Sequence, residues 1–561
     1  MNTTFILNII LLFVFQFTEC QNLSLHISGE DPTQTKIIDS VGYKKTFKDL
    51  KSIEFEIKIL SEQLQNLGYI ELQLEPLKQN TSKTFTLHIN LKQHYQDIYI
   101  YDYSSYFSQE DVKRVSAQIH SDYFIIPLSQ TNSTLSQLNR ILINKGAPFS
   151  TLQLQHIQKH NATHLKAILT PSLSPTRTID NIIIKGYEKF PKSYLKHFLK
   201  IKKGNLFTIE TLKTKASQLQ SIPFANAIKP PEILFTTDST DIYLYIEQTK
   251  INSFDGFLGF GTNEDSNNIE FDGYLNLILT NNLHYGESLK LNYKSDEIDQ
   301  KTLNINLNLP YIFSSPLGTE LELNIFKKDS TFTTTKQAAN IFYQLTPIQK
   351  IFTGLTSIQS NNLLEISTTE INDYSSQFYN LRYEYIKNNL KSRVFPINFA
   401  VKTTLSTGFR KTTEDKTTQN SINVFLEKNF KLNDYNSFYI KYNSAILFSE
   451  NFLNNELFRF GGINSIRGFE ENSIESNAFG VLNTEYRYII SQNLYIHSII
   501  DLSYFENQNN NLKEKLFGFG FGFGLLTQSG LLKFNYANGK TEKQNFKFSD
   551  SKIHISLTAK F

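Results

Sequence analysis

Hydrophobic positions follow one period up to about residue 250 and a different one after it. In the segment 301–310, apolar residues occupy every second position and Thr or Asn lies between them. The segments 270–280, 318–327 and 551–561 alternate in the same way. Period-two alternation predicts β-strands with one apolar and one polar face. Turns rich in Asn, Asp, Ser and Gly separate these segments, so the sequence predicts an antiparallel sheet over 251–561.

Before residue 251, apolar residues recur at helical spacing in three segments, each followed by Gly or Pro and then by strand-like residues. These breaks fall at Gly68, Gly146 and Pro223, at nearly equal intervals of about 78 residues. Each repeat has the pattern strand–helix–helix–strand–strand. The leucines on the helical faces of the first two are Leu60, Leu64, Leu67, Leu135, Leu138 and Leu142. The repeats predict three α+β units, at 21–94, 95–175 and 176–250, and one irregular α+β domain is the alternative.

The first twenty residues have the features of an export signal. The apolar segment 5–15 has the length of a signal-peptide core and is too short to span a bilayer. Thr18 and Cys20 are small enough to precede a cleavage site, which predicts a signal peptide over 1–20. Lipidation of Cys20 is the alternative. Because Cys20 is the only cysteine, the mature chain is expected to lack disulfides and thiolate metal sites.

The alternating region fits a transmembrane β-barrel. No apolar run after residue 20 approaches the roughly 18 residues of a membrane helix, but barrel strands alternate lipid-facing and lumen-facing residues and give no such run. Residues 251–561 provide about 19 residues for each strand and turn of a 16-stranded barrel. The strand faces opposite the apolar ones are uniformly polar, which indicates a water-filled lumen. Closing the sheet into a barrel would also remove its free edges. A soluble β-sandwich or β-helix is the alternative.

Charge and motifs narrow the possible functions. Lys and Arg number 56 against 53 Asp and Glu, whereas nucleic-acid-binding proteins usually carry a strongly basic face. We therefore expect no nucleic acid as a partner. The sequence contains neither a Gly-x-Ser-x-Gly elbow nor a His-Glu-x-x-His motif, and 535–541 ends like a phosphate loop but has Phe534 where the first glycine would stand. We expect neither an enzyme nor a cofactor or metal site.

A loop between two strand-like segments carries Arg467 in the sequence "GGINSIRGFEENSI". The strands that follow place Glu485 and Asp501 on their polar, lumen-facing sides. The next strand alternates Phe with glycine, and interior strand glycines often mark the close approach of another segment. Its four glycines are Gly518, Gly520, Gly522 and Gly524. Two interpretations stay open: the loop folds inward and pairs Arg467 with a carboxylate, or the loop is solvated and the glycines only relieve crowding.

The segment 461–473 resembles the signature of the outer-membrane assembly family that includes BamA and TamA, and 482–505 and 519–539 resemble that family's last barrel strands. The three N-terminal units resemble its POTRA domains. The resemblance implies an α+β POTRA series followed by a 16-stranded barrel with an inward-folded loop. It assigns the loop motif to Arg467, Gly468 and Phe469, the carboxylate that meets the arginine to Asp501, and a second possible partner to Glu485. The chain departs from the family at Ile466, where valine is commoner, and at Ser503, where glycine would be expected.

The resemblance also implies a function at the outer membrane, with the N-terminal units in the periplasm. A weak seam between 257–261 and 552–561, marked by Phe257, Gly259 and Phe561, would open and template client strands. The implied partners are unfolded outer-membrane proteins, outer-membrane lipids and periplasmic or lipoprotein accessory factors. A dedicated two-partner secretion pore is the main alternative, although such pores usually begin with a plug helix and 21–27 has a strand pattern. A passive porin or receptor is a more distant alternative.

Overall fold

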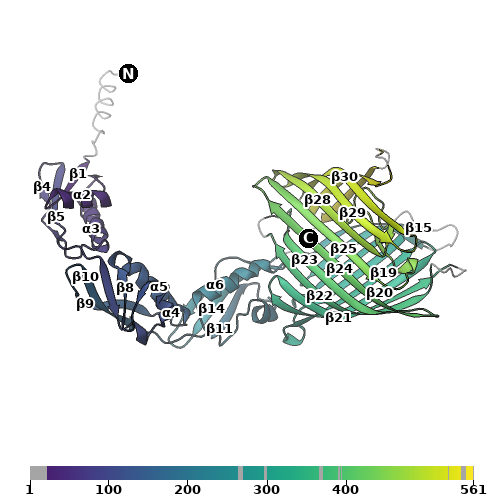
Figure 1. The fold of residues 1–561 in the computed structure, drawn as a ribbon, viewed down its shortest axis with the longest axis horizontal. Coiled ribbons are helices and arrows are strands. Elements are labelled where there is room, and N and C mark those ends of the chain that lie inside the picture. Colours follow the sequence, from purple (N-terminus) through teal and green to yellow (C-terminus); the bar gives the residue numbers. More distant parts are fainter. Residues whose placement is uncertain are drawn as a thin grey trace, which may run out of the picture. The chain divides into compact units, whose positions relative to one another are not determined.

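The structure is a computed structural model of the chain (Figure 1). It describes residues 22–249, 251–262, 269–295, 300–364, 371–389, 392, 394–527, 530–544, 547 and 551–559, without the side chains of 257–262, 269–272 and 556–559. The predicted signal peptide, Cys20 and Phe561 lie outside the described residues. Among the described residues, no helix combines the length and the apolar character needed to cross a membrane. The chain divides into two compact units, Met1–Thr178 with Leu206–Glu210, and Ile179–Asn205 with Thr211–Phe561.

The first α+β sheet has the strand order β2-β1-β5-β3, with β4 also paired to β5. Asp31 and Asp49 cap its two helices, because their side chains accept hydrogen bonds from the Gln34 and Ser52 backbone N–H groups. Leu67 was predicted on the buried helical face but is 46% exposed, because α3 ends beside it. The elements are β1 (Leu23–Gly29), α2 (Pro32–Val41), β2 (Thr46–Phe47), α3 (Leu50–Asn66), β3 (Gln73–Leu74), β4 (Lys78–Gln79) and β5 (Thr84–Asn90).

The second sheet has the order β7-β8-β6-β10-β9. Its β7–β8 hairpin lies between the two helices and is an addition to the predicted strand–helix–helix–strand–strand pattern. The elements are β6 (Asp97–Tyr101), η2 (Tyr103–Ser105), α4 (Gln109–Val112), β7 (Gln118–Ile119), β8 (Tyr123–Pro127), η3 (Leu128–Gln130), α5 (Thr131–Asn144), β9 (Thr151–Lys159) and β10 (His164–Ser172).

The third sheet has the order β11-β14-β12, with β13 also paired to β14. The three sheets share one feature: the first strand pairs in parallel with the last, β1 with β5, β6 with β10 and β11 with β14. A parallel pair needs a long crossover connection, which the helices provide. The elements of the third sheet are β11 (Asn181–Gly186), the π-helix η4 (Tyr194–Phe198), α6 (Ile209–Ser217), η5 (Gln218–Ser221), β12 (Ala225–Ala227), β13 (Glu232–Phe235) and β14 (Thr240–Gln248).

A 16-stranded antiparallel sheet follows, and its first and last strands, β15 and β32, lie side by side. The predicted fold class, α+β units before a barrel, is confirmed. The predicted domain boundaries fall between the sheets and stay predictions. The barrel strands are β15 (Ser253–Thr262), β16 (Ile269–Thr280), β17 (Ser288–Ser295), β18 (Gln300–Leu309), β19 (Leu317–Lys328), β20 (Phe332–Thr346), β21 (Gln349–Asn362), β22 (Tyr374–Asn388), β23 (Ile397–Lys411), β24 (Lys416–Lys431), β25 (Asn436–Phe448), β28 (Ala478–Ser491), β29 (Leu494–Asn507), β30 (Leu512–Leu526), β31 (Gly530–Thr541) and β32 (Ser551–Ala559), with the short helix η6 (Ile312–Ser314) before β19.

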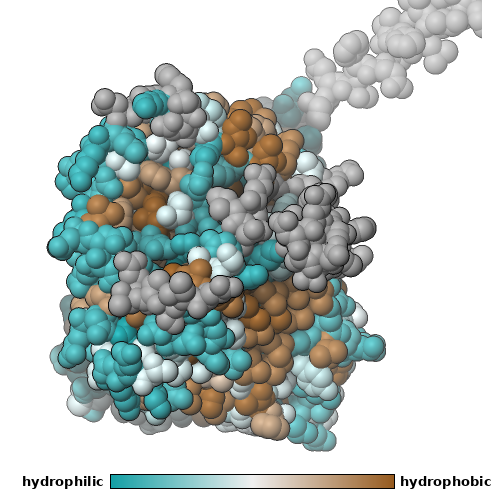
Figure 2. All heavy atoms as spheres, turned by 90° about the vertical axis from the view of Figure 1, so that its right-hand side faces the viewer, coloured by the Kyte–Doolittle hydropathy of each residue, from teal (hydrophilic) through white to brown (hydrophobic). Residues whose placement is uncertain are grey.

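The two faces of this sheet differ in polarity, as the alternation predicts. In β28, Glu485 is buried on the inner face, whereas Tyr486 and Tyr488 are exposed on the outer face. Figure 2 shows hydrophobic residues gathered into continuous areas beside hydrophilic ones on the face that it draws. An outward apolar surface is what a bilayer requires of a barrel. The sandwich alternative does not hold, because the strands form a single sheet whose end strands meet.

The third sheet and the barrel belong to the same compact unit and contact each other directly. The Tyr187 hydroxyl lies 2.8 Å from His284 Nδ1 and accepts a hydrogen bond from Asn281 Nδ2 at 2.7 Å. The ring of Tyr194 fills the space over Gly286, where a Cβ would collide with it. These contacts join η4 and the end of β11 to the turn between β16 and β17.

Candidate functional site

The connection between β25 and β28 folds into the barrel lumen. Successive antiparallel strands alternate in direction, so this connection leaves the barrel at the end opposite to the turn between β16 and β17. It contains a short helix, η7 (Asn454–Glu456), and two strands, β26 (Phe458–Phe460) and β27 (Ile474–Ser476), which pair with each other. We call residues 449–477 the lumen loop. Arg467 near its tip is only 5% exposed, so the solvated interpretation of this loop does not hold.

Arg467 makes four hydrogen bonds to two carboxylates. Its backbone N–H and its Nε donate to Asp501 Oδ2 at 3.0 and 2.8 Å, and its Nη2 donates to Asp501 Oδ1 at 2.7 Å. Its Nη1 donates to Glu485 Oε1 at 2.5 Å. The structure thus brings together all three charged residues that the sequence singled out. Bonds of this bidentate, charge-assisted kind are stronger than neutral ones and fix the orientation of the guanidinium.

The strands position these carboxylates through their register. Asn483 lies opposite Asp501 in the β28–β29 pair, and Glu485 follows two residues later on the same inner face. Asn483 Nδ2 donates to the Ser465 carbonyl at 2.6 Å, which holds the loop backbone next to the arginine. Arg487, two positions further, donates from Nε to Glu485 Oε2 at 2.7 Å. Glu485 therefore joins two arginines, which compensates the cost of burying its charge.

The lumen wall around the loop tip also has an apolar patch. Ile466 is completely buried and packs with Phe460 of the loop. Their wall partners are Val481, Phe505 and Leu516, which lie on three successive strands. Burying side chains of this size stabilises the docked loop by about 1.5–3 kcal/mol each. Ile466 thus supplies the apolar contact, although valine is commoner there in the family that the sequence resembles.

Only one of the four predicted glycines lies against the loop. A Cβ at Gly518 would collide with the Arg467 carbonyl, so this glycine admits the loop backbone. A Cβ at Gly520 would instead meet the backbone of β31, and one at Gly522 would meet His497 and Asn535. At Gly524 the space is filled by the ring of Tyr495. The structure therefore places Gly518 against the loop and the other three glycines against neighbouring parts of the barrel wall.

Sequence reasoning missed Gly539, which completes the loop's binding surface. Gly539 is paired directly with Gly518 across β30 and β31, so the two leave one continuous stretch of bare backbone. Gly468 lies on it with a φ of 91°, a conformation that favours glycine. The ring of Phe469 lies beside Gly539. The inward register of Gly539 was readable from the strand alternation and could have revealed it.

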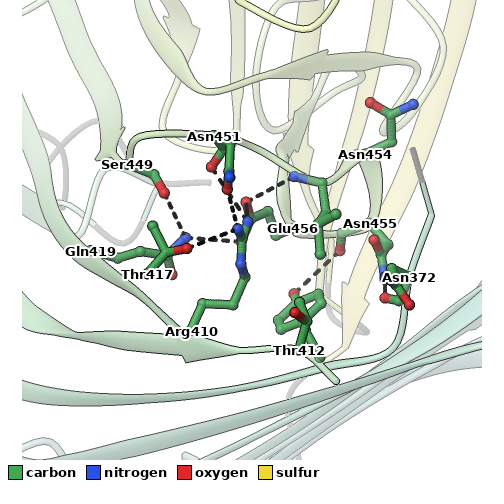
Figure 3. A network of polar contacts seen from close by, with 12 residues as sticks. Asn372, Arg410, Thr412, Thr417, Gln419, Ser449, Asn451, Asn454, Asn455 and Glu456 are labelled. Atoms are coloured by element: carbon green, nitrogen blue, oxygen red, sulfur yellow. Dashed lines mark hydrogen bonds and ion pairs between the residues drawn. The ribbon is translucent and has the colours of Figure 1, made fainter. Parts of the chain in front are cut away.

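A second buried anchor, also missed, holds the beginning of the lumen loop (Figure 3). Arg410 of β23 and Glu456 of η7 form an ion pair, and their side chains are only 3% and 4% exposed. Gln419 Nε2 donates to the other Glu456 oxygen at 3.0 Å. Asn455 Nδ2 donates to Ser360 Oγ and to the Asn372 carbonyl, both at 2.9 Å. The loop is therefore fixed to the wall at β21–β24 as well as at β28–β31.

The remaining predicted site residues, Phe257, Gly259 and Phe561, were expected to mark the seam between the first and last barrel strands. Phe257 and Gly259 lie in β15, where their backbones pair with Tyr274 and Asp272 of β16. Phe561 lies outside the described residues. Among the described residues, no group of three or more His, Cys, Asp or Glu side chains could hold a metal ion. The site consists of hydrogen bonds, ion pairs and close backbone packing.

Comparisons with known proteins agree with this architecture. The family model described as "POTRA: Surface antigen variable number repeat" matches residues 177–249. No curated protein matches the chain. The structure of CdiB from Acinetobacter baumannii is similar, with a TM-score of 0.52 and 15% identity, over 90% of this chain and 97% of that one. CdiB from Escherichia coli also has a TM-score of 0.52, with 12% identity, over 90% of this chain and 98% of that one.

A structure of BamA from Haemophilus ducreyi lacking POTRA domains 1–3 covers 77% of this chain and 94% of its own, with 16% identity and a TM-score of 0.48. The POTRA match and the two CdiB structures agree with the fold that the sequence predicts. The chain therefore contains a POTRA domain at residues 177–249 and has the fold of the two CdiB structures, which in this chain consists of three α+β sheets followed by a 16-stranded β-barrel.

Proposed function

We propose that this protein assembles other β-barrel proteins into the outer membrane and uses its own lateral seam as the template. The observation that carries the proposal is the strand order. Pairing runs from β15 to β32, and within the described residues no strand pairing joins these two neighbours. A seam without a full ladder of hydrogen bonds can open at lower cost than any other strand boundary of the barrel.

The physical reason for a template is the cost of unpaired backbone groups. A client strand that enters hydrocarbon with free N–H and C=O groups loses several kcal/mol for each group. Pairing with the edge of β15 or β32 satisfies these groups while the client folds. This is β-augmentation, in which an extended segment adds a strand to an exposed sheet edge.

The α+β sheets offer edges of the same kind before the client reaches the barrel. Strand β9 is nine residues long, forms the edge of the second sheet and is mostly exposed. A long free edge is available for pairing with another extended chain. We propose that unfolded outer-membrane proteins are held at such edges on their way to the seam.

The test is to deplete the protein from its native cells and to quantify every other outer-membrane barrel by mass spectrometry. General assembly predicts a broad loss of barrel proteins. The loss of a single exported substrate, with the other barrels unchanged, would contradict the proposal and support a dedicated secretion pore.

The secretion pore is the second candidate because the fold match to CdiB covers nearly the whole chain. Two observations support the assembly role instead. Residues Leu23–Gly29 form a strand of the first sheet rather than a plug helix. Three α+β sheets precede the barrel, one more than such pores usually carry.

A further inference from the structure

Two acidic residues directly follow the Arg-Gly-Phe motif and reach opposite sides of the seam. Glu470 Oε1 accepts a hydrogen bond from Lys552 Nζ at 3.0 Å, and Lys552 lies on β32. Glu471 Oε2 lies 3.6 Å from Lys294 Nζ, and Lys294 lies on β17. Neighbouring residues of one loop therefore contact the last strand of the barrel and its third strand.

The loop tip is held in place independently of these two pairs. Arg467 is fixed by Asp501 and Glu485, and Gly468 lies on the bare backbone of Gly539. The carboxylate of Glu471 also packs over Gly462, where a Cβ would collide with it. The two glutamates are thus presented from a rigid base that is attached to β28–β31, on the β32 side of the seam.

We propose that the pairs Glu470–Lys552 and Glu471–Lys294 form a seam latch, which holds the β17 and β32 sides of the barrel together. This inference rests on the proposed function, in which the seam must open for a client. The lumen loop connects the two sides of the seam, and the ion pair between Glu471 and Lys294 is the contact that crosses it. The pair between Glu470 and Lys552 attaches β32 to the same loop.

Both ion pairs of the latch are partly exposed to water, as expected for contacts that must break when the seam opens. The side chains of Glu470 and Lys552 are 53% and 42% exposed, and those of Glu471 and Lys294 are 26% and 42% exposed. Ion pairs with such access to water are weak and are screened by salt. The Arg467–Asp501 pair is almost fully buried, with side chains 6% and 0% exposed. The latch can therefore open while the base of the loop stays docked.

The distance across the seam tests the latch directly. Phe254 on β15 and Ile553 on β32 are 43% and 61% exposed and can carry spin labels after replacement by cysteine. Cys20 is the only native cysteine and is replaced by serine. Pulsed electron paramagnetic resonance on the full chain in liposomes then gives the fraction of molecules with a widened seam.

We expect the double variant Glu470→Gln/Glu471→Gln to raise the widened fraction about two- to fivefold. Wild type in about 1 M salt should shift in the same direction, because the Debye length falls to about 3 Å. The charge swap Glu470→Lys with Lys552→Glu should bring the fraction back toward wild type relative to Glu470→Lys alone. The matched control is Glu506→Gln, which removes the Glu506–Lys513 pair (3.2 Å) between β29 and β30, and should change nothing.

An unchanged widened fraction in a folded double variant, or in wild type across the salt series, overturns the latch. If the double variant does not fold, the salt series on wild type decides. A widened seam in the variant, together with normal levels of other barrels in cells depleted of the protein, has a different meaning. It supports the latch and contradicts the proposed assembly function, so the two failures are distinguishable.

Discussion

Gly468 and Gly539 meet backbone to backbone, and neither position can accept a side chain. A Cβ on Gly468 would collide with the Gly539 backbone nitrogen, and a Cβ on Gly539 would lie 2.6 Å from the Gly468 carbonyl oxygen. Gly518, directly opposite Gly539 in the sheet, has the same relationship to the Arg467 carbonyl. The loop motif is therefore held both by the bare backbone of Gly518 and Gly539 and by the carboxylates of Glu485 and Asp501.

Replacing Gly539 with alanine should displace the loop tip. The added methyl group has no space, and overpacking of this kind costs about 1–3 kcal/mol. We expect a lower unfolding temperature of the barrel in heat-modifiability gels and faster proteolysis of the lumen loop. Gly480→Ala on the outer face is the control, because its nearest contact would be the Tyr442 hydroxyl at 3.2 Å. Equal stability of wild type and Gly539→Ala would contradict the close backbone packing.

Arg467→Ala should release the loop and impair client assembly while export of the protein itself continues. Removing one member of a buried ion pair leaves the other charge uncompensated, which costs about 3–5 kcal/mol. Arg467→Lys keeps the charge but loses the planar fork, so it should fall between alanine and wild type. The measurements are the barrel unfolding temperature and the level of other outer-membrane barrels. Normal client levels with a correctly folded Arg467→Ala barrel would count against a role of the loop in assembly.

The Arg410–Glu456 anchor should show strong coupling in a double-mutant cycle. Glu456→Gln or Arg410→Met alone leaves a buried charge without its partner, and each should cost about 3–5 kcal/mol. The double variant removes both charges and should be less destabilised than the sum of the two single variants. Denaturant unfolding of the barrel measures the cycle. Strict additivity would mean that the pair does not act as a unit.

The contact between Glu71 and Lys159 should make the first compact unit sensitive to pH. The hydrogen bond from Lys159 (2.8 Å) lowers the pKa of Glu71 below its usual 4.5, and the same bond raises the pKa of Lys159 above 10.5. A lowered carboxylate pKa stabilises the fold above pH 4.5, and this stabilisation disappears as the pH falls through the folded pKa. A raised lysine pKa stabilises the fold below pH 10.5, and this is lost as the pH rises through the folded value.

The measurement compares wild type with Lys159→Met in urea, followed by tyrosine fluorescence, since the chain contains no Trp and 29 Tyr. We expect wild type to be the more stable protein between about pH 5 and 10. The two curves should converge below pH 4.5. A stability difference that persists at pH 3 would mean that packing of the Lys159 stem, and not the ion pair, is responsible.

The inner-face position of the two carboxylates could be predicted from the sequence because it depends only on local strand geometry. Successive side chains of a strand point to opposite faces, so the alternation around Glu485 and Asp501 was enough to place both in the lumen. The predicted helical face ending at Leu67 and the strand-like residues predicted after Gly68 were less accurate. In the structure the helix stops beside Leu67 and β3 contains only Gln73 and Leu74. Element ends depend on capping and tertiary packing, which periodicity does not report.

The sequence by itself determined the two-part architecture, the inward direction of the carboxylates and the presence of a glycine-rich wall. Each of these follows from a periodicity that can be read along the chain: two residues for strands, 3.6 residues for helices and about 78 residues for the α+β units. Only the tertiary structure decided that Arg467 takes both carboxylates, that Gly539 and not Gly524 receives the loop, and that Arg410 holds Glu456. These contacts join residues far apart in the chain, and they exist only because closure of the sheet brings its walls within reach of one loop.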